Sequence, residues 1–349
     1  MTICVTVTLA SLVAVPSVTQ GKAANPYFGV MSQRPLSEDE FDLMSAGGIG
    51  TYRFPVAWSR MEPEDGARFN WHGLDGVVAS TARRGIRLLP TLYHAPKWLT
   101  GAQNRMPVGK SEWERRWERF VGAMVTRYGS GGDFWIENRD LPYRPVRSWQ
   151  IWNEPNIRNF AAPVSAPRYA RLLKQTARRI RMIDPWAKIV MGGLYGRPPK
   201  GTGVPAGRFL KRLYRTPGFK RSFDVAAVHP YGITAGDAMS RLRPVRRVLD
   251  ARNDRRRRIA VTEVGWGSDA RTGFGKRSRR GQATELRRFM RKLRRDHRQL
   301  RVSTVVWFSW SDVSHRQVAC EFCYRTGLFD QTGTAKPAWR ALLGFSRPR

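Results

Sequence analysis

The sequence alternates short apolar segments with helix-like segments eight times, and this alternation restricts the fold more than any other feature. Each apolar segment has the length and composition of a buried strand, and in the segments after them apolar residues recur with the period of a helix. Parallel strands joined by helices make an α/β protein, and eight such units predict a closed (β/α)8 barrel, or TIM barrel, built as a single domain. The expected strands are 26–31, 49–54, 86–92, 146–152, 188–192, 223–228, 258–262 and 302–308.

Capping residues mark where helices are expected to begin. Ser37 and Glu40 form a capping box, and so do Ser111 and Glu114, which precede a helix that runs to about Tyr128. The tryptophans of that helix recur with a period of 3.6 residues, so we expect them to pack in the core. No glycine-rich phosphate loop follows the first strand, which argues against a dinucleotide-binding fold.

The N-terminus has the pattern of an export signal. Residues 3–18 are mostly apolar and contain no Lys, Arg, Asp or Glu, and a small-residue cleavage site follows near Ala23 or Ala24. We therefore expect a signal peptide over residues 1–24, a mature domain over 25–349 and a secreted protein. Because Met1 and Thr2 carry no positive charge, a short membrane anchor or a misassigned start remains the alternative.

Three cysteines bear on redox state and metal binding. Cys4 would leave with the signal peptide, while Cys320 and Cys323 remain with two residues between them. One such pair offers too few ligands for a structural zinc site, and no paired histidines follow it. In an exported protein a local disulfide is the expected state, and a dithiol redox site is the weaker alternative because no thioredoxin-like unit surrounds the pair.

The chain is strongly basic, with 62 Lys and Arg against 27 Asp and Glu and a formal net charge of +35. Such a charge attracts polyanions, including nucleic acid and acidic polysaccharide. The basic runs at 255–258, 276–280 and 287–301 fall on expected outer helices and loops, with few aromatic residues between them. We therefore favour solvated helix faces and expect no specific nucleic-acid partner, since a nucleic-acid groove needs stacking rings. Electrostatic association with an anionic cell envelope remains open.

Two glutamates follow two of the expected strands. The strand 146–152 leads into Asn153, Glu154 and Pro155, and the strand 258–262 leads into Glu263. The carboxyl ends of barrel strands meet at one rim, where active sites lie. A carboxyl group that loses water there has a raised pKa and suits a proton donor, while a second one can remain ionised. One acid and one anion are what glycoside hydrolysis requires.

These motifs resemble the clan A glycoside hydrolases, which are retaining enzymes on a (β/α)8 barrel. Their pattern is an Asn-Glu pair after the fourth strand and a Glu after the seventh, which Asn153-Glu154 and Glu263 match. The passages 128–135 and 148–156 are similar to family 39 and to cellulase-like (family 5) enzymes that cleave exopolysaccharides. The resemblance covers about 27–345 and implies that Glu154 is the acid/base and Glu263 the nucleophile.

The resemblance also suggests supporting residues. Asn153 is an uncharged donor suited to a sugar 2-hydroxyl, and Arg53 would keep Glu263 ionised. The other matched positions are His229 and Tyr231 to orient the nucleophile, His94 to contact the sugar, Trp307 and Trp310 as aromatic platforms, and Asp312 to bind a hydroxyl. Each has a structural alternative: a plain salt bridge for Arg53, a hydrogen-bonded rim histidine for His94, turn packing for His229 and Tyr231, barrel core for Trp307, loop packing for Trp310 and a loop cap for Asp312.

Together these features predict a secreted, monomeric retaining glycosidase that uses neither metal nor cofactor. The expected substrate is a β-linked polysaccharide or oligosaccharide, and endo action is favoured over exo action. Within this class, β-xylosidase or uronidase activity is the nearest rival. Outside it, the alternatives are a non-catalytic glycan-binding barrel and a binder of polyanions at the cell envelope.

Overall fold

The computed structural model describes residues 24–269, 277–315, 320 and 322–347. The expected signal peptide, apart from Ala24 at its end, lies outside the described residues. Within them, no helix combines the length and the apolar character needed to cross a membrane.

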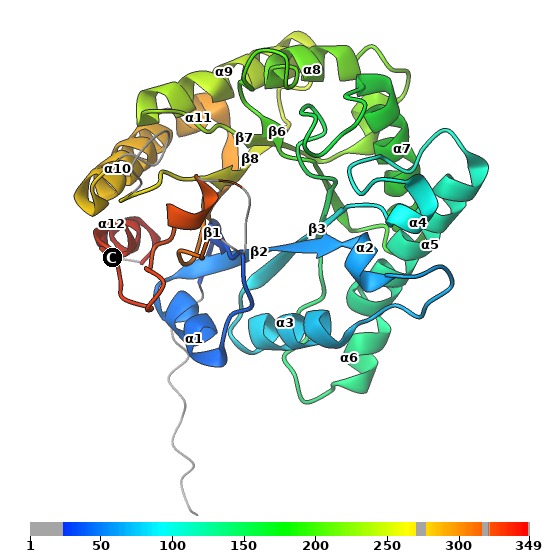
Figure 1. Ribbon diagram of the computed structural model, residues 1–349, viewed down its shortest axis with the longest axis horizontal. Coiled ribbons are helices and arrows are strands. Elements are labelled where there is room, and N and C mark those ends of the chain that lie inside the picture. Colours follow the sequence, from blue (N-terminus) through cyan, green and yellow to red (C-terminus); the bar gives the residue numbers. More distant parts are fainter. Residues whose placement is uncertain (1–23, 270–276, 316–319, 321, 348–349) are drawn as a thin grey trace, which may run out of the picture.

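The strands form a closed parallel barrel (Figure 1). Their order is β5-β4-β3-β2-β1-β9-β8-β7-β6, and a pairing of β5 with β7 closes the ring. The eight-stranded barrel predicted from the alternation is confirmed, since β5 and β6 are two pieces of one barrel strand. The strands are β1 (Asn25–Met31), β2 (Ile49–Ala57), β3 (Arg87–Tyr93), β4 (Ser148–Ile151), β5 (Lys188–Met191), β6 (Leu194–Tyr195), β7 (Val225–His229), β8 (Arg258–Val264) and β9 (Val302–Phe308).

Helices surround the barrel, as Figure 1 shows. Most follow a strand and return the chain to the opposite end of the barrel, which is how parallel neighbours are connected. The helices are α1 (Glu38–Ala46), α2 (Trp58–Met61), α3 (His72–Arg83), α4 (Lys97–Thr100), α5 (Ser111–Tyr128), α6 (Asp133–Glu137), α7 (Ala166–Ile183), α8 (Ala206–Leu213), α9 (Ala235–Ala251), α10 (Arg279–Arg295), α11 (His297–Leu300) and α12 (Pro337–Ser346), with short 3₁₀ turns at Phe219–Ser222 and Cys323–Arg325.

The helix α5 shows how the sequence pattern produces the packing. Its residues Trp117, Phe120 and Met124 have no exposed surface, because they share the face that lies against the barrel. The Trp117 indole donates a 2.7 Å hydrogen bond to Thr176 of α7, which joins the two helices. The predicted core role of these tryptophans is confirmed, and truncating one of them to alanine would cost about 3–5 kcal/mol.

Only one of the two predicted capping boxes forms. Ser37 caps α1 and exchanges hydrogen bonds with Glu40, as predicted. The second prediction is wrong: Ser111 is the first residue of α5, and its N-cap is Lys110, which makes no side-chain cap. Because the helix begins one residue early, Glu114 accepts instead from the Gly109 N–H, at 2.8 Å.

The gap between β5 and β6 is a glycine pair, and it makes room for a buried histidine. A Cβ atom on Gly193 would lie 2.0 Å from His229 Nε2, so only glycine fits there. His229 ends β7 and is completely buried, with its ring inside the barrel mouth. The break in the fifth strand thus positions a titratable ring at the carboxyl ends of the strands.

Candidate functional site

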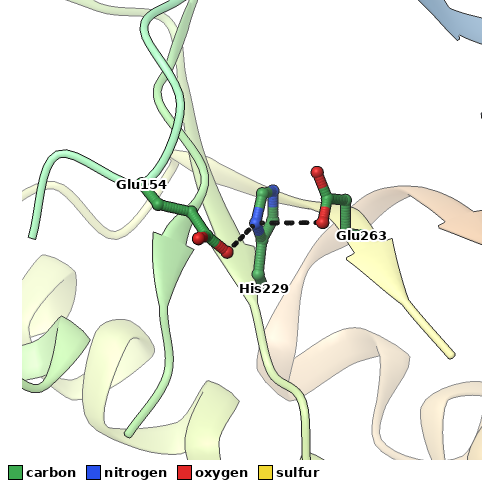
Figure 2. Close-up of side chains that lie close together, drawn as sticks. All are labelled: Glu154, His229 and Glu263. Carbon is green, nitrogen blue, oxygen red and sulfur yellow. Dashed lines mark hydrogen bonds and ion pairs between the residues drawn. The ribbon is translucent and has the colours of Figure 1, made fainter. Parts of the chain in front are cut away.

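Glu154 lies just beyond β4, where the backbone bends sharply. Trp152 and Glu154 have φ angles of 68° and 40°, in the left-handed region that residues other than glycine seldom adopt. Each costs about 1–3 kcal/mol, so the surroundings must hold them there. Trp152 supplies part of that support, because its indole donates to Phe160 O at 2.7 Å and its N–H to Leu92 O at 2.8 Å. The bend directs the Glu154 side chain towards His229 (Figure 2).

Glu263, in β8, supplies the second carboxyl group. Figure 2 shows His229 between the two carboxyls, with Nδ1 lying 2.7 Å from Glu154 Oε1 and 3.5 Å from Glu263 Oε2. An oxygen of Glu154, an oxygen of Glu263 and a ring nitrogen of His229 all lie within 4.8 Å of one another. Retaining glycosidases hold their carboxyls about 5–5.5 Å apart and inverting ones about 6.5–9.5 Å apart. The separation here is on the retaining side.

Arg53 and Tyr231 both contact Glu263. The Arg53 Nη1 atom lies 2.6 Å from Glu263 Oε1, and the Tyr231 hydroxyl donates to Glu263 Oε2 at 2.6 Å. Arg53 also donates to Gln150 Oε1 at 2.7 Å and to Asn153 Oδ1 at 2.8 Å. The guanidinium is therefore fixed from three sides, and both oxygens of Glu263 have a donor.

Glu154 has a different neighbourhood, in which the His229 ring contacts its carboxyl. The other ring nitrogen, Nε2, lies 2.9 Å from Thr262 Oγ1, and Thr262 in turn accepts from Gln150 Nε2 at 3.1 Å. Because Nδ1 faces two carboxyl groups, we assign it the hydrogen and the donor role. Gln150 thus connects the support of Glu154 to the support of Glu263.

The two carboxyls have pKa values shifted in opposite directions. Burial raises the pKa of Glu154, and the nearby Glu263 raises it further, although the His229 ring works against both. Burial also raises the pKa of Glu263, but the His229 ring, the Arg53 guanidinium and the Tyr231 hydroxyl outweigh it and hold that pKa below its ordinary value. When the pair holds one proton, this arrangement favours the proton on Glu154 and the negative charge on Glu263.

The same three residues also have the donor types of a cation site. Glu154, His229 and Glu263 together offer two carboxylates and an imidazole. However, the Arg53 guanidinium already balances the charge of Glu263 at 2.6 Å, and a metal ion would have to bind beside it. The guanidinium would repel a metal cation bound to the same carboxylate, so the arrangement suits proton transfer better than metal binding.

An aromatic cluster lines the site beside Tyr231. The Tyr231 ring lies 5.8 Å from Tyr195, 6.1 Å from Phe308 and 5.3 Å from Phe322, measured between ring centroids. Phe322 sits in the loop closed by a disulfide between Cys320 and Cys323, and Gln33 Nε2 donates to Cys323 O at 2.6 Å. Phe308 was not predicted as a site residue, although strand alternation places it on the face of β9 opposite to Trp307.

The platform role predicted for Trp307 and Trp310 is wrong. Trp307 is 1% exposed, packs against Trp266 at 6.0 Å and donates to Thr326 O at 3.1 Å. Trp310 is also 1% exposed and donates to Glu40 at 2.8 Å. A ring with so little exposed surface cannot present a face to a sugar, so both tryptophans are core residues.

Asp312 is also engaged elsewhere. Its carboxylate lies 2.7 Å from Lys336 Nζ, and it accepts from the Gly327 N–H at 2.8 Å. Both partners are buried, so the pair ties the chain after β9 to the start of α12. The predicted hydroxyl-binding role of Asp312 is therefore wrong, since its acceptors are used within the protein.

His94 and Asn153 lie at the rim, as their positions after β3 and β4 require. His94 has a φ of 55° and stacks on Phe160 with a centroid distance of 5.8 Å. Burial, and then the charge of Arg60, lowers the pKa of His94 to about 4, so the ring is neutral at neutral pH. Asn153 directs its carbonyl oxygen to Arg53, which turns its NH₂ group away from the guanidinium.

Comparison with curated proteins finds glycosidases. No protein-family model matches the chain. A β-glucosidase of Agrobacterium sp. is 28% identical over 145 residues, which covers 39% of this chain and 30% of that enzyme. A β-xylosidase of Geobacillus stearothermophilus is 26% identical over 152 residues, which covers 40% of this chain and 27% of that enzyme. The matched segment thus spans less than a third of either enzyme.

Solved structures of glycoside hydrolases share the fold. A family 39 glycoside hydrolase of Bacteroides cellulosilyticus superposes with a TM-score of 0.70 at 18% identity, over 92% of this chain and 63% of that one. A monomeric β-xylosidase of Caulobacter crescentus gives 0.62 at 18% identity, over 92% and 68%. A family 5 enzyme of Bifidobacterium longum gives 0.66 at 14% identity, over 91% and 77%. At these identities the likeness establishes the barrel fold, and the neighbours come from the families that the sequence resembles.

Proposed function

We propose that the protein is a retaining glycosidase that cleaves a β-linked polysaccharide or oligosaccharide by double displacement. The observation that carries this proposal is the pair formed by Glu154 and Glu263, whose oxygens approach within 4.8 Å at the carboxyl ends of the barrel strands. Their opposed pKa shifts give one proton donor and one anion. The β-glycosidase relatives support the substrate class.

In the first step Glu154 protonates the leaving oxygen while Glu263 attacks the anomeric carbon. One C–O bond breaks as another forms, so a covalent glycosyl-enzyme results and Glu154 is left ionised. Arg53 and Tyr231 hold the attacking carboxylate in place, each at 2.6 Å. The NH₂ group of Asn153 is free to donate to a hydroxyl of the bound sugar.

In the second step a water molecule replaces the leaving group. The ionised Glu154 takes a proton from this water, the water oxygen attacks the anomeric carbon, and Glu263 departs as a carboxylate. The His229 Nδ1–H, 2.7 Å from Glu154 Oε1, stabilises the ionised form between the two steps. Two inversions give net retention of configuration.

The test is NMR of the first-formed anomer during hydrolysis of β-glucosides, β-xylosides and purified polysaccharides. We expect the β-anomer to appear first, and we expect Glu263→Ala to abolish turnover while glycan binding persists. Appearance of the α-anomer first would eliminate the nucleophile role of Glu263. Persisting hydrolysis by Glu263→Ala would eliminate the site. Chain length of the products separates endo from exo action; one solved neighbour is named an exo-β-1,4-mannosidase, whereas we propose endo action.

We also propose that the protein is exported and acts as a monomer. The apolar stretch at residues 3–18 and the disulfide between Cys320 and Cys323 support an oxidising destination. Secretion by the native host, with N-terminal sequencing of the mature protein, tests the export. A mature chain that begins near Asn25 is the expected result.

A further inference from the structure

Arg241 on α9 is a half-buried cation whose charge is not balanced. Its side chain lies along Gly196, since a Cβ atom there would be 3.0 Å from Arg241 Cβ and 3.1 Å from its Cδ. Among the described residues its guanidinium has no carboxylate within 4.0 Å and no hydrogen-bond acceptor. The charge of Asp237 acts on Arg241, but the Asp237 carboxylate accepts its hydrogen bonds from Thr234. Partial burial removes some of the water around this cation without supplying a partner, which suggests a partner that binds from outside.

Short contacts connect Arg241 to the two glutamates. Gly196, which Arg241 covers, donates its N–H to His229 O at 2.9 Å. The preceding residue, Tyr195, packs on Tyr231, which donates to Glu263. Burial raises the pKa of Tyr195, and the charges of Glu154 and Arg241 then act on it in opposite directions. Arg241 therefore lies beside Gly196, at the end of the barrel that holds Glu154.

The rim around this mouth carries an excess of positive charge. Arg60, Arg158 and Arg197 follow β2, β4 and β6, are exposed, and have no carboxylate within 4.0 Å among the described residues. The carboxylates in the loops after β2, β8 and β9 are mostly neutralised by partners within the protein. Such pairs are Glu62 with Arg119, Asp65 with Arg116, Asp269 with Arg279, Asp330 with Arg279 and Asp312 with Lys336.

We propose that Arg241 binds a negatively charged group of the glycan, a carboxylate or a sulfate ester, and that the substrate is an anionic polysaccharide. The inference rests on the proposed glycosidase function and specifies its substrate class. A guanidinium matches the planar, two-oxygen geometry of such groups, and binding them replaces the water that burial removes from it. The exposed rim arginines add attraction at longer range, which salt weakens.

The test compares Arg241→Gln with wild type on substrates that differ only in charge. The pairs are 4-nitrophenyl β-glucuronide with β-glucoside, and carboxymethylcellulose with hydroxyethylcellulose. Sulfated and carboxylated forms of one glycan then distinguish the two anionic groups. Arg247→Gln is the matched control, because Arg247 lies on the exposed side of the same helix, about 9 Å further along its axis. It removes the same charge without touching the mouth.

We expect wild type to prefer the charged member, and Arg241→Gln to lower kcat/KM for it about tenfold or more, mainly through KM. For Arg241→Gln we expect kcat/KM on the neutral member to stay within about twofold of wild type. For Arg247→Gln we expect the same on both members. Equal losses on both members, or the same loss in Arg247→Gln, would overturn the role of Arg241. Preference of wild type for neutral glycans would overturn the substrate class alone, whereas no hydrolysis of any glycan would refute the glycosidase function itself.

Discussion

Two buried ion pairs lie at the same end of the barrel, and they differ in what surrounds them. Arg53 and Glu263 approach to 2.6 Å, and Lys336 and Asp312 to 2.7 Å. The acceptors of Asp312 are used by Lys336 and Gly327, and within the described part of the chain Lys336 forms an ion pair with no other carboxylate. Glu263 has another carboxyl within 4.8 Å, so its pair carries one more acid than cation. The balanced pair leaves no charge uncompensated, whereas the excess acid beside Glu263 has a raised pKa and can hold a proton.

The largest effect is expected when Glu154, the excess acid, is replaced. Glu154→Gln keeps the shape and the contact with His229 but cannot give up a proton. We expect kcat/KM to fall by about 10²–10⁴ for natural glycans, with a smaller loss for aryl glycosides whose leaving groups need no proton. Steady-state kinetics measure this, and an unchanged melting temperature serves as the control. Full activity on unactivated glycans would show that Glu154 is not the acid.

The pH profile of the same variant gives a second measurement. In the proposed mechanism Glu263 must be ionised, so activity should rise as pH rises through the lowered pKa of Glu263. The mechanism also needs Glu154 protonated, so activity should fall as pH rises through the raised pKa of Glu154. The two groups titrate as a pair, so the limbs report values of the pair. In Glu154→Gln the high-pH limb should disappear while the low-pH limb remains.

Breaking the balanced pair should damage stability and spare chemistry. Lys336→Met leaves Asp312 ionised in a buried site, which costs about 3–5 kcal/mol of unfolding free energy. Denaturant unfolding measures this loss, and kcat per folded molecule should be unchanged. Burial already raises the pKa of Asp312. Without Lys336 that pKa rises further, so the loss should be full above the raised folded-state pKa of Asp312 and should shrink as pH falls through it towards the unfolded-state pKa.

The double variant Lys336→Met with Asp312→Leu is the control for that reasoning. It removes both charges and should recover most of the lost stability, since no unpaired charge stays buried. If Lys336→Met also lowered kcat at temperatures well below its unfolding transition, the two ion pairs would not have separate roles.

Tyr231→Phe tests how the site sets the charge of the nucleophile. The hydroxyl donates to Glu263 Oε2 at 2.6 Å, and its loss removes one hydrogen bond to a charged group. We expect kcat to fall about tenfold to a hundredfold. Because this hydroxyl lowers the pKa of Glu263, the low-pH limb should move to higher pH. A reduced kcat with an unmoved limb would assign Tyr231 a packing role.

Sequence reasoning reached the barrel and the two glutamates because both depend on local pattern. Eight strand-like runs fix the topology, and the end of a strand fixes the rim to which Glu154 and Glu263 belong. The spacing between Glu154 and Glu263, 109 positions apart, depends on barrel closure, which no local pattern encodes.

The remaining site residues depend on partners that are distant in sequence. Asp312 follows a strand just as Glu263 ends one, and only its contact with Lys336, from the loop before α12, reveals a structural role. Trp307 and Phe308 are adjacent aromatic residues, and strand register decides which of them faces the mouth. Arg241 lies on a helix, and only the fold shows that no carboxylate of the described residues lies within 4.0 Å of its guanidinium.

The smallest predicted effect concerns the loop whose Phe322 ring packs against Tyr231. The disulfide between Cys320 and Cys323 closes the loop that holds Phe322, and the Phe322 ring contacts Tyr231 at 5.3 Å. Replacing both cysteines by serine frees the loop, and an aromatic contact of this kind contributes about 0.5–1.5 kcal/mol. We expect KM to rise about threefold and kcat to change less. Dithiothreitol should have the same effect on wild type and none on the serine variant, whereas equal sensitivity of both would show that the disulfide does not act through Phe322.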